Sequence, residues 1–233
     1  AQRAKYARIA ELAGISAGVE VLEIGSGWGG FAEYAAGAGA SVTGLTIAEE
    51  QLKYAEKRMA EAGFSDRTTF KLLDFADERG QYDAVVSIEM IESIDQERWP
   101  ALFEAISTNL RPGGRAGLQA IVIDDDIWKT YRNRDDFIRE YIFPGGRVPP
   151  PSLIRELSAG VGLRTVEVVD FGASYARTLS MWLDRFDAAW PEIAALGFDD
   201  RFRRMWRYYL AYCEAGFNTG RISVQQWAFE RGT

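Results

Sequence analysis

The segment Val21-Leu-Glu-Ile-Gly-Ser-Gly-Trp-Gly-Gly30 constrains the fold of this chain more than any other part of it. An apolar run with a single acid, Glu23, leads into a glycine-rich turn, and a helical pattern follows over residues 31–36. This order predicts a strand, a tight loop and a helix N-terminus. Because glycine lacks a Cβ and tolerates positive φ, the backbone of such a corner can approach a ligand closely. We therefore expect a nucleotide-like ligand here.

The glycines by themselves leave the ligand open. Gly25, Gly27 and Gly30 satisfy the G-x-G-x-x-G spacing of dinucleotide-binding enzymes. The second predicted strand, Ser41–Thr46, nevertheless ends without the acid that binds ribose in an NAD site. The residues from Glu23 to Gly29 instead resemble motif I of the class I S-adenosylmethionine (SAM) methyltransferases. A SAM site is favoured, with a dinucleotide site and a purely structural turn as alternatives.

Composition excludes several other classes of protein. The chain has 233 residues and no histidine, so it has neither a Ser-His-Asp triad nor a histidine-based zinc site, and we predict no metal centre. The net charge of −7 argues against a nucleic-acid partner. One cysteine excludes an internal disulfide and suits a reducing cytoplasm. No apolar run approaches the roughly 20 residues of a membrane span.

Strand and helix patterns alternate over most of the chain, which predicts an α/β fold with a doubly wound, mostly parallel seven-stranded sheet. The predicted strands cover residues 20–24, 41–46, 68–73, 82–88, 116–123, 164–171 and 222–230. The predicted helices cover residues 4–13, 31–37, 49–62, 99–110 and 152–160. We expect one Rossmann-like domain over residues 1–233, with a turn at residues 111–114.

Two further segments predict a helical cap over the carboxyl edge of the sheet, where ligands bind in such folds. Residues 124–139 are charged and aromatic and are expected to be helical, and a turn-rich loop follows over residues 141–151. Residues 175–218 have the pattern of two long amphipathic helices with aromatic faces. These faces suit either packing or an acyl channel. Cys213 lies on one of them and is expected to be a core residue.

Five segments together resemble the cyclopropane-fatty-acyl-phospholipid synthases, whose relatives include mycolic acid cyclopropane synthases and fatty acid methyltransferases. They are Glu23-Ile-Gly-Ser-Gly-Trp-Gly-Gly-Phe31, Val42-Thr-Gly-Leu-Thr-Ile-Ala-Glu-Glu-Gln51, Glu89-Met-Ile-Glu92, Tyr141-Ile-Phe-Pro-Gly-Gly146 and Tyr208-Tyr-Leu-Ala-Tyr-Cys-Glu-Ala-Gly-Phe217. The similarity runs in order from Ala1 to the C-terminus. The resemblance implies a class I methyltransferase fold and a SAM-dependent C-methyltransferase.

The resemblance also implies which residues bind SAM. Gly25 and Gly27 would pass its methionine part, and Asp74 and Phe75 would flank the adenine by a hydrogen bond and by stacking. The full set of expected contacts is Glu23, Gly25, Ser26, Gly27, Trp28, Gly29, Thr46, Ile47, Gln51, Asp74 and Phe75. Thr46, Ile47 and Gln51 belong to the tip of the second strand, where the family contacts ribose.

The implied methyl acceptor is a cis double bond in an acyl chain of a phospholipid. An alkene is a poor nucleophile, so it must be held in line with the sulfonium methyl, and transfer leaves a carbocation on the chain. Aromatic faces can stabilise that cation. The candidates are Tyr131, Tyr141, Phe143, Tyr175 and Trp182. Loss of a proton from the methyl group gives a cyclopropane, and loss from a neighbouring carbon gives a methyl-branched chain, so both products stay open.

In the family the base is a bound bicarbonate, held partly by residues that match Glu92 and Tyr175. Three departures affect that site here. Gln119 stands in place of a family histidine, and Glu89 stands where many bacterial members have glycine. With Glu92, Glu89 is expected to place two carboxylates three apart on one helical face. The family cysteine of the anion site lies upstream of motif I, so we expect an N-terminal segment to be absent from this chain.

Less specific interpretations remain beside these. Glu92 could cap a helix, Tyr175 could be an ordinary buried tyrosine, and the arginines at 201, 203, 204 and 207 could form a solvated face. The acceptor could be a soluble small molecule, or the chain could be a non-catalytic SAM-binding partner subunit. The leading hypothesis places the protein in the cytoplasm, peripherally at the inner membrane face, as a possible homo-oligomer or with a partner reductase.

Overall fold

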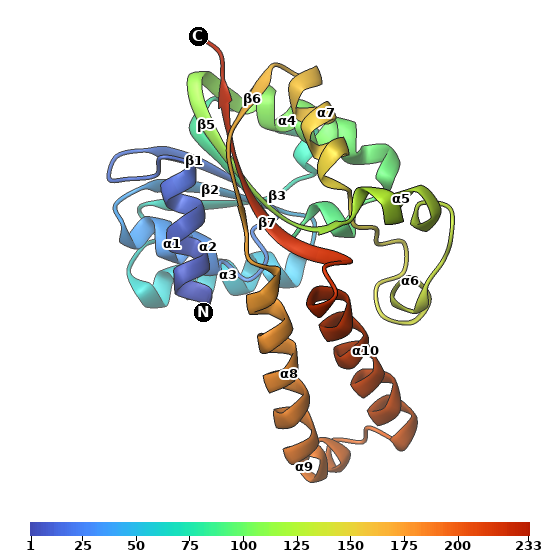
Figure 1. Cartoon of the computed structure of the whole chain (residues 1–233). Coiled ribbons are helices and arrows are strands. Elements are labelled where there is room, and N and C mark those ends of the chain that lie inside the picture. Colours follow the sequence, from blue (N-terminus) through green and yellow to red (C-terminus); the bar gives the residue numbers. More distant parts are fainter.

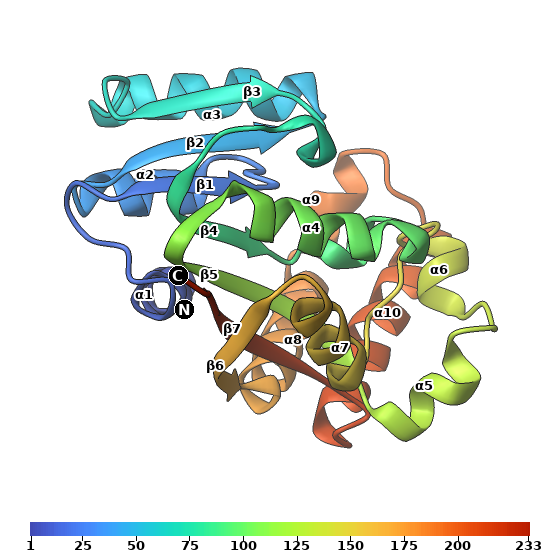
Figure 2. The same cartoon turned by 90° about the horizontal axis from the view of Figure 1, so that it is seen from above.

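A single seven-stranded sheet forms the centre of the computed structural model, which describes residues 1–233. The strand order is β3-β2-β1-β4-β5-β7-β6, and Figure 2 shows this order across the sheet. Only β7 runs antiparallel to its neighbours. The bounds are β1 Glu20–Ile24, β2 Ser41–Thr46, β3 Thr68–Leu72, β4 Tyr82–Ile88, β5 Leu110–Ile123, β6 Leu163–Asp170 and β7 Ile222–Arg231. The predicted doubly wound sheet is confirmed.

Helices cover both faces of the sheet, and a second group extends from its end (Figure 1). The helices on the sheet are α1 Gln2–Leu12, α2 Gly30–Gly37, α3 Glu49–Ala62, α4 Trp99–Asn109 and α7 Pro151–Gly160. The cap contains α5 Asp125–Tyr131, α6 Phe137–Tyr141, α8 Gly172–Ala188, α9 Trp190–Ala195 and α10 Asp200–Asn218. Short 3₁₀ turns lie at Phe75–Asp77, Ile91–Ser93 and Gln96–Arg98.

The two faces of the sheet build two separate apolar cores, as the alternation of side chains along a strand requires. In β1, Leu22 joins the core beneath α4 and α7, which contains Trp99 and Trp227. Val21 joins the core beneath α1, α2 and α3, which contains Phe31. Both tryptophans and Phe31 are almost completely buried. The paired cores hold the carboxyl ends of β1, β2, β4 and β5 at one edge.

The cap follows the predicted pattern of two long helices. Helices α8 and α10 run side by side away from the sheet, with α9 at their far end (Figure 1). They share a third apolar core around Leu179, Leu210 and Phe217. At the far end, Leu196 is 78% exposed and Phe198 is 46% exposed. The cap therefore presents apolar side chains to solvent at its tip.

Two expectations from the sequence were wrong in detail. The segment 124–139 is not one helix, because α5 ends at Tyr131 and α6 begins only at Phe137. Strand β5 begins at Leu110, so the predicted turn at residues 111–114 is an irregular start of the strand. Its register shifts against β4 between Tyr82 and Ala84, which accommodates this irregularity.

Candidate active site

The glycine-rich corner after β1 has the geometry that the sequence predicts. Gly25, Gly27 and Gly29 have φ values of 80°, 51° and 75°, a region that favours glycine. The amides of Gly25 and Ser26 donate to the carbonyl of Leu45 at 3.1 and 2.8 Å. A Cβ on Gly25 would lie 2.7 Å from Cγ of Met90, the second residue after β4. The loop is therefore fixed against β2 and against the segment that follows β4.

Glu23 lies in β1 just before this loop and is only 3% exposed. Burial raises the pKa of its carboxyl group well above the usual value, although a hydrogen bond from the backbone of Ala32 opposes this shift. Its Oε2 is buried without a hydrogen-bond partner. A buried, unpartnered carboxyl oxygen beside a loop of open backbone suits a ligand that carries an ammonium group, as the methionine part of SAM does.

The tip of β2 is partly organised without a ligand. Thr46 Oγ1 donates to Gln51 Oε1 at 2.8 Å and accepts from the amide of Ala48 at 3.1 Å. Ile47 is 76% exposed at the same tip. Trp28 is half exposed, and its ring centre lies 5.3 Å from that of Tyr54 in a T-shaped arrangement. These residues surround the loop as the sequence predicts, and their contacts with ribose stay a prediction.

The pair expected to flank the adenine is held by a residue that the sequence did not reveal. Arg98 donates to Asp74 Oδ1 at 2.7 Å, and this contact lowers the pKa of Asp74. The guanidinium of Arg98 also lies 4.6 Å from the ring centre of Phe75. Phe75 is only 7% exposed and belongs to the core. One face of its ring is therefore covered by Arg98, and stacking on adenine stays a prediction for the other face.

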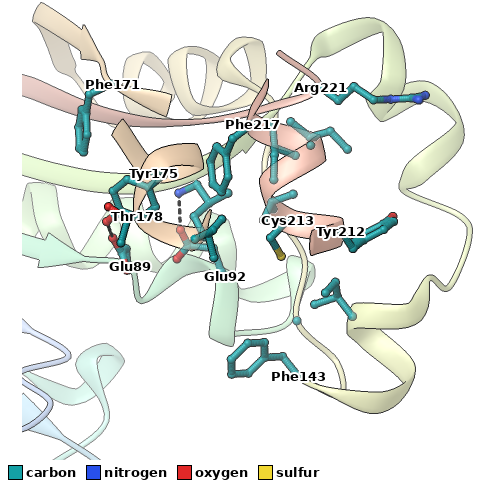
Figure 3. Close-up of a pocket in the computed structure, with 18 of the residues that line it drawn as sticks. Glu89, Glu92, Phe143, Phe171, Tyr175, Thr178, Tyr212, Cys213, Phe217 and Arg221 are labelled. Atoms are coloured by element: carbon teal, nitrogen blue, oxygen red, sulfur yellow. Dashed lines mark hydrogen bonds between the residues drawn. The ribbon is translucent and has the colours of Figure 1, made fainter. Parts of the chain in front are cut away.

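A cavity of about 1340 Å³ lies between the carboxyl edge of the sheet and the cap, and 21 of its 37 lining residues are hydrophobic. Of the residues predicted to contact substrate or intermediate, the cavity is lined by Tyr131, Phe143, Tyr175 and Trp182. Figure 3 labels Phe143 and Tyr175 in its wall. Tyr141 is not in its wall and is half exposed, so the structure gives no support to its predicted role.

Glu89 and Glu92 both line this cavity, but they do not share a helical face as expected. Glu89 directly follows β4 and has a φ of 51°, which makes it the only non-glycine residue with positive φ. Glu92 lies in the short 3₁₀ turn Ile91–Ser93. The left-handed conformation of Glu89 explains why glycine is suited to this position.

Glu92 holds the next strand and does not cap a helix. Its Oε1 accepts a hydrogen bond of 2.5 Å from the amide of Ile121 in β5, and its Oε2 is buried without a partner. Burial raises the pKa of Glu92 to about 8, and the charge of Glu89 adds to the shift. The carboxyl group is therefore mostly protonated at neutral pH. The alternative that Glu92 is a helix cap was wrong.

Glu89 is the centre of a partly buried hydrogen-bond network. Its Oε1 accepts from the hydroxyl of Tyr175, which lies beside Glu89 in Figure 3. It also accepts from Nε2 of Gln119 at 2.5 Å. Lys5 Nζ lies 3.6 Å from the same oxygen. Gln226 Nε2 donates to Gln119 Oε1 at 2.8 Å. Burial, and then the Glu89 carboxylate, raises the pKa of Tyr175, so the tyrosine keeps its proton and acts as a donor.

Lys5 and Gln226 are functional candidates that the sequence reasoning missed. Lys5 is on α1 and Gln226 is on the last strand, so neither lies near a motif in the sequence. The side-chain Nε2 of Gln226 also donates to the backbone oxygen of Lys5 at 3.1 Å. Only the packing of α1 against β5 and β7 brings these residues to the carboxylates.

The structure also shows the surroundings of Cys213 and of the arginines on α10. Cys213 packs in the cap core, as predicted for a core residue, and in addition lines the cavity. Burial raises the pKa of its thiol to about 12. Of the four arginines on α10, Arg207 and Arg203 lie 3.4 and 3.9 Å from Asp187 of α8. Part of this predicted solvated face therefore joins the two cap helices.

The fold and the glycine corner are those of the class I SAM-dependent methyltransferases, and the comparisons with known proteins identify the family. The family model described as mycolic acid cyclopropane synthetase matches residues 1–227. The chain therefore belongs to this family. A solved mycolic acid cyclopropane synthase is complexed with SAH, which favours SAM over a dinucleotide as the ligand of the glycine corner. The predicted resemblance is confirmed.

Individual relatives extend the comparison. The chain is 42% identical to tuberculostearic acid methyltransferase UfaA1 of Mycobacterium tuberculosis over 99% of its length and 54% of that protein. It is 38% identical to cyclopropane-fatty-acyl-phospholipid synthase of Escherichia coli over 100% of its length and 58% of that protein. The chain thus spans little more than half the length of these curated relatives.

A solved structure shows the same architecture. Mycolic acid cyclopropane synthase CmaA1, complexed with SAH and CTAB, superposes with a TM-score of 0.89 at 25% identity. The match covers 99% of this chain and 84% of that one. The shared region includes the sheet, the glycine corner and the cap helices.

Proposed function

We propose that this chain transfers the methyl group of SAM to a carbon of a cis double bond in an acyl chain of a phospholipid. The observation that carries the proposal is the mainly apolar cavity of about 1340 Å³ whose wall includes Glu89 and Glu92. Pockets for compact small molecules are typically about 300–1,000 Å³. A larger, mainly hydrophobic space suits a long acyl chain better than a small polar acceptor.

The residues of the cavity suit the chemistry of such an acceptor. Apolar walls hold the alkene without water, which would otherwise capture the carbocation. The rings of Tyr175 and Phe217 lie 5.6 Å apart in the wall, and Tyr131 and Phe143 line it from the cap. Aromatic faces near a developing cation lower its energy. The cation then loses a proton to a base at the polar end of the cavity.

The names of the relatives support the acyl substrate. UfaA1 is a tuberculostearic acid methyltransferase and the Escherichia coli relative is a cyclopropane-fatty-acyl-phospholipid synthase. CmaA1 was solved with CTAB, a detergent with a single long alkyl chain. A cyclopropane and a methyl-branched chain both follow from the same transfer. A branched product would retain a double bond, and its saturation would require a separate reductase as partner.

The tip of the cap supplies a contact with the lipid surface. No helix is long and apolar enough to cross a bilayer. The exposed side chains of Leu196 and Phe198 instead project from the turn between α9 and α10. Apolar side chains at such a tip can enter the interface of a bilayer, and the neighbouring arginines of α10 can meet anionic headgroups. We place the protein peripherally at the cytoplasmic membrane face.

The experiment measures transfer of a radiolabelled methyl group from SAM into lipid extracted from vesicles. We expect label in vesicles of cis-monounsaturated phosphatidylglycerol and none in vesicles of the matched saturated lipid. Label in neither, while SAM binds by calorimetry, would contradict the proposal and favour a soluble acceptor or a non-catalytic partner subunit. Label in both would place the methyl group elsewhere than on the double bond.

A further inference from the structure

We propose that the carboxylate of Glu89 is the base of the reaction, and that it occupies the place where a bound bicarbonate would otherwise be held. This inference rests on the proposed transfer of a methyl group to an alkene. It assigns the proton acceptor to a side chain of the protein. It also predicts that turnover does not require bicarbonate.

Two hydrogen-bond donors of this site already bind Glu89. The hydroxyl of Tyr175 and Nε2 of Gln119 both donate to Glu89 Oε1. Gln119 is completely buried, and its Oε1 is occupied by Gln226, so its amide presents Nε2 to the carboxylate. Tyr175 and Gln119 are among the residues expected to hold bicarbonate. Both side chains already donate hydrogen bonds to a carboxylate of the protein, that of Glu89.

The charges around Glu89 disfavour a second anion. Lys5 is the cation of this network, at 3.6 Å from Glu89 Oε1. Gln119 is neutral, where a histidine could have carried a positive charge. A second anion would compete with Glu89 for the same donors and would be repelled by its like charge at short range. The residues present therefore do not fit a bound bicarbonate beside Glu89.

Glu92 is less suited than Glu89 to accept a proton. The pKa of Glu92 is about 8, so most of this group carries a proton at neutral pH and cannot accept another. Its Oε1 is also tied to the amide of Ile121 in β5. Glu92 is therefore not the proton acceptor at neutral pH, and Glu89 is the other carboxyl group of the pair in the cavity wall. Glu92 acts as a positioning residue that holds β5.

The position of Glu89 also suits a base. Glu89 lines the cavity, and the next residue, Met90, packs against Gly25 of the SAM loop. The carboxylate thus belongs to a short segment that touches both the donor site and the acceptor cavity. Its φ of 51° is unfavourable for a residue with a Cβ. Such strain is typical of functional positions.

The proposed step balances in electrons and protons. The π pair of the alkene forms a bond to the methyl carbon, and the electron pair of the breaking C–S bond stays on sulfur. The carbocation then loses a proton to Glu89. If the proton comes from the new methyl group, its C–H pair closes the cyclopropane ring. If it comes from a neighbouring chain carbon, that pair forms a new double bond.

The main test measures methyl transfer in buffers stripped of carbon dioxide and in buffers with added bicarbonate. Wild-type turnover should be equal in both. Glu89→Gly should lose about 100-fold or more of the activity without bicarbonate, the usual contribution of a general base, and should recover part of it when bicarbonate fills the space. Glu89→Gln should lose as much and show no recovery, because its amide still fills the space. A wild type that needs bicarbonate, or an active Glu89→Gln, would overturn the proposal.

Two further measurements separate this test from loss of folding and from failure of the proposed function. Because glycine is favoured at a φ of 51°, Glu89→Gly should melt at or above the wild-type temperature. ¹³C-bicarbonate line broadening, without SAM or lipid, should be saturable with Glu89→Gly and absent with the wild type. Saturable binding to the wild type, or none to either protein, would contradict the replacement of bicarbonate by Glu89 even if no lipid is methylated.

Discussion

Replacing Glu92 with glutamine should stabilise the fold, and the gain should increase with pH. Burial raises the pKa of this carboxyl group from 4.5 to about 8 in the folded protein. In the unfolded chain the group loses its proton near the lower value. Between these two values the folded state binds more protons than the unfolded state, so the contribution of Glu92 to stability falls as the pH rises.

The size of the effect follows from the pKa shift. Each pH unit inside the window changes the free energy of unfolding by about 1.4 kcal/mol. Between pH 5 and pH 8 the contribution of Glu92 should therefore fall by about 3.5 kcal/mol, since the slope flattens near each pKa. Glutamine does not titrate, and its Oε1 can still accept from the amide of Ile121. The free energy of unfolding of the variant therefore does not fall with pH because of this position.

The assay is urea unfolding of wild type and Glu92→Gln at several pH values from 5 to 8. The difference in unfolding free energy between the two proteins should grow with pH in favour of the variant, while groups elsewhere cancel in the comparison. A difference that is constant over this range would refute the assignment of a raised pKa to Glu92. A gain that grows toward low pH would mean that the carboxylate is stabilised by its surroundings.

Further predictions concern the SAM loop, the cap tip and the thiol. Gly25→Ala should weaken SAM binding by calorimetry at least about tenfold, because its Cβ has no space and its φ is positive, whereas Gly160→Ala, which has open space, should not. Leu196→Asp should reduce sedimentation with anionic vesicles, and Val166→Asp on the exposed edge strand should leave it unchanged. Cys213 should react with a disulfide reagent at pH 8 roughly 100-fold more slowly in the folded than in the unfolded chain, since its pKa is raised to about 12. Unchanged SAM affinity, vesicle binding or thiol reactivity would contradict the respective argument.

Local signals in the sequence were sufficient for most of the fold. The bounds of β2, β4 and α3 agree with the predicted ranges. Helix α3 ends where expected because Gly63 adopts a φ of 76°, which terminates a helix. The glycine corner was predicted for the same reason, since three residues there need positive φ. Each of these features depends on residues that are close together in the chain.

Features that depend on distant contacts could not be predicted. The partners of Glu89 come from α1, β5 and α8, and nothing in the sequence near Glu89 identifies Lys5. Arg98 was missed because it reaches Asp74 across 24 residues. The spacing of Glu89 and Glu92 indicated a helix, but Glu89, directly after β4, adopts a left-handed conformation that places the two carboxyl groups differently. Tertiary packing decided each of these positions.

The central claim is that the methyl group reaches the double bond of an acyl chain, and one measurement tests it most directly. SAM with a fully deuterated methyl group is supplied with vesicles of a cis-monounsaturated phospholipid, and the released acyl chains are analysed by mass spectrometry. Acyl chains that gain one carbon and keep two deuterium atoms would show a cyclopropane, and those that keep three would show a methyl branch. Both results agree with the account. Deuterium only on the headgroup, or on no lipid at all, would contradict it.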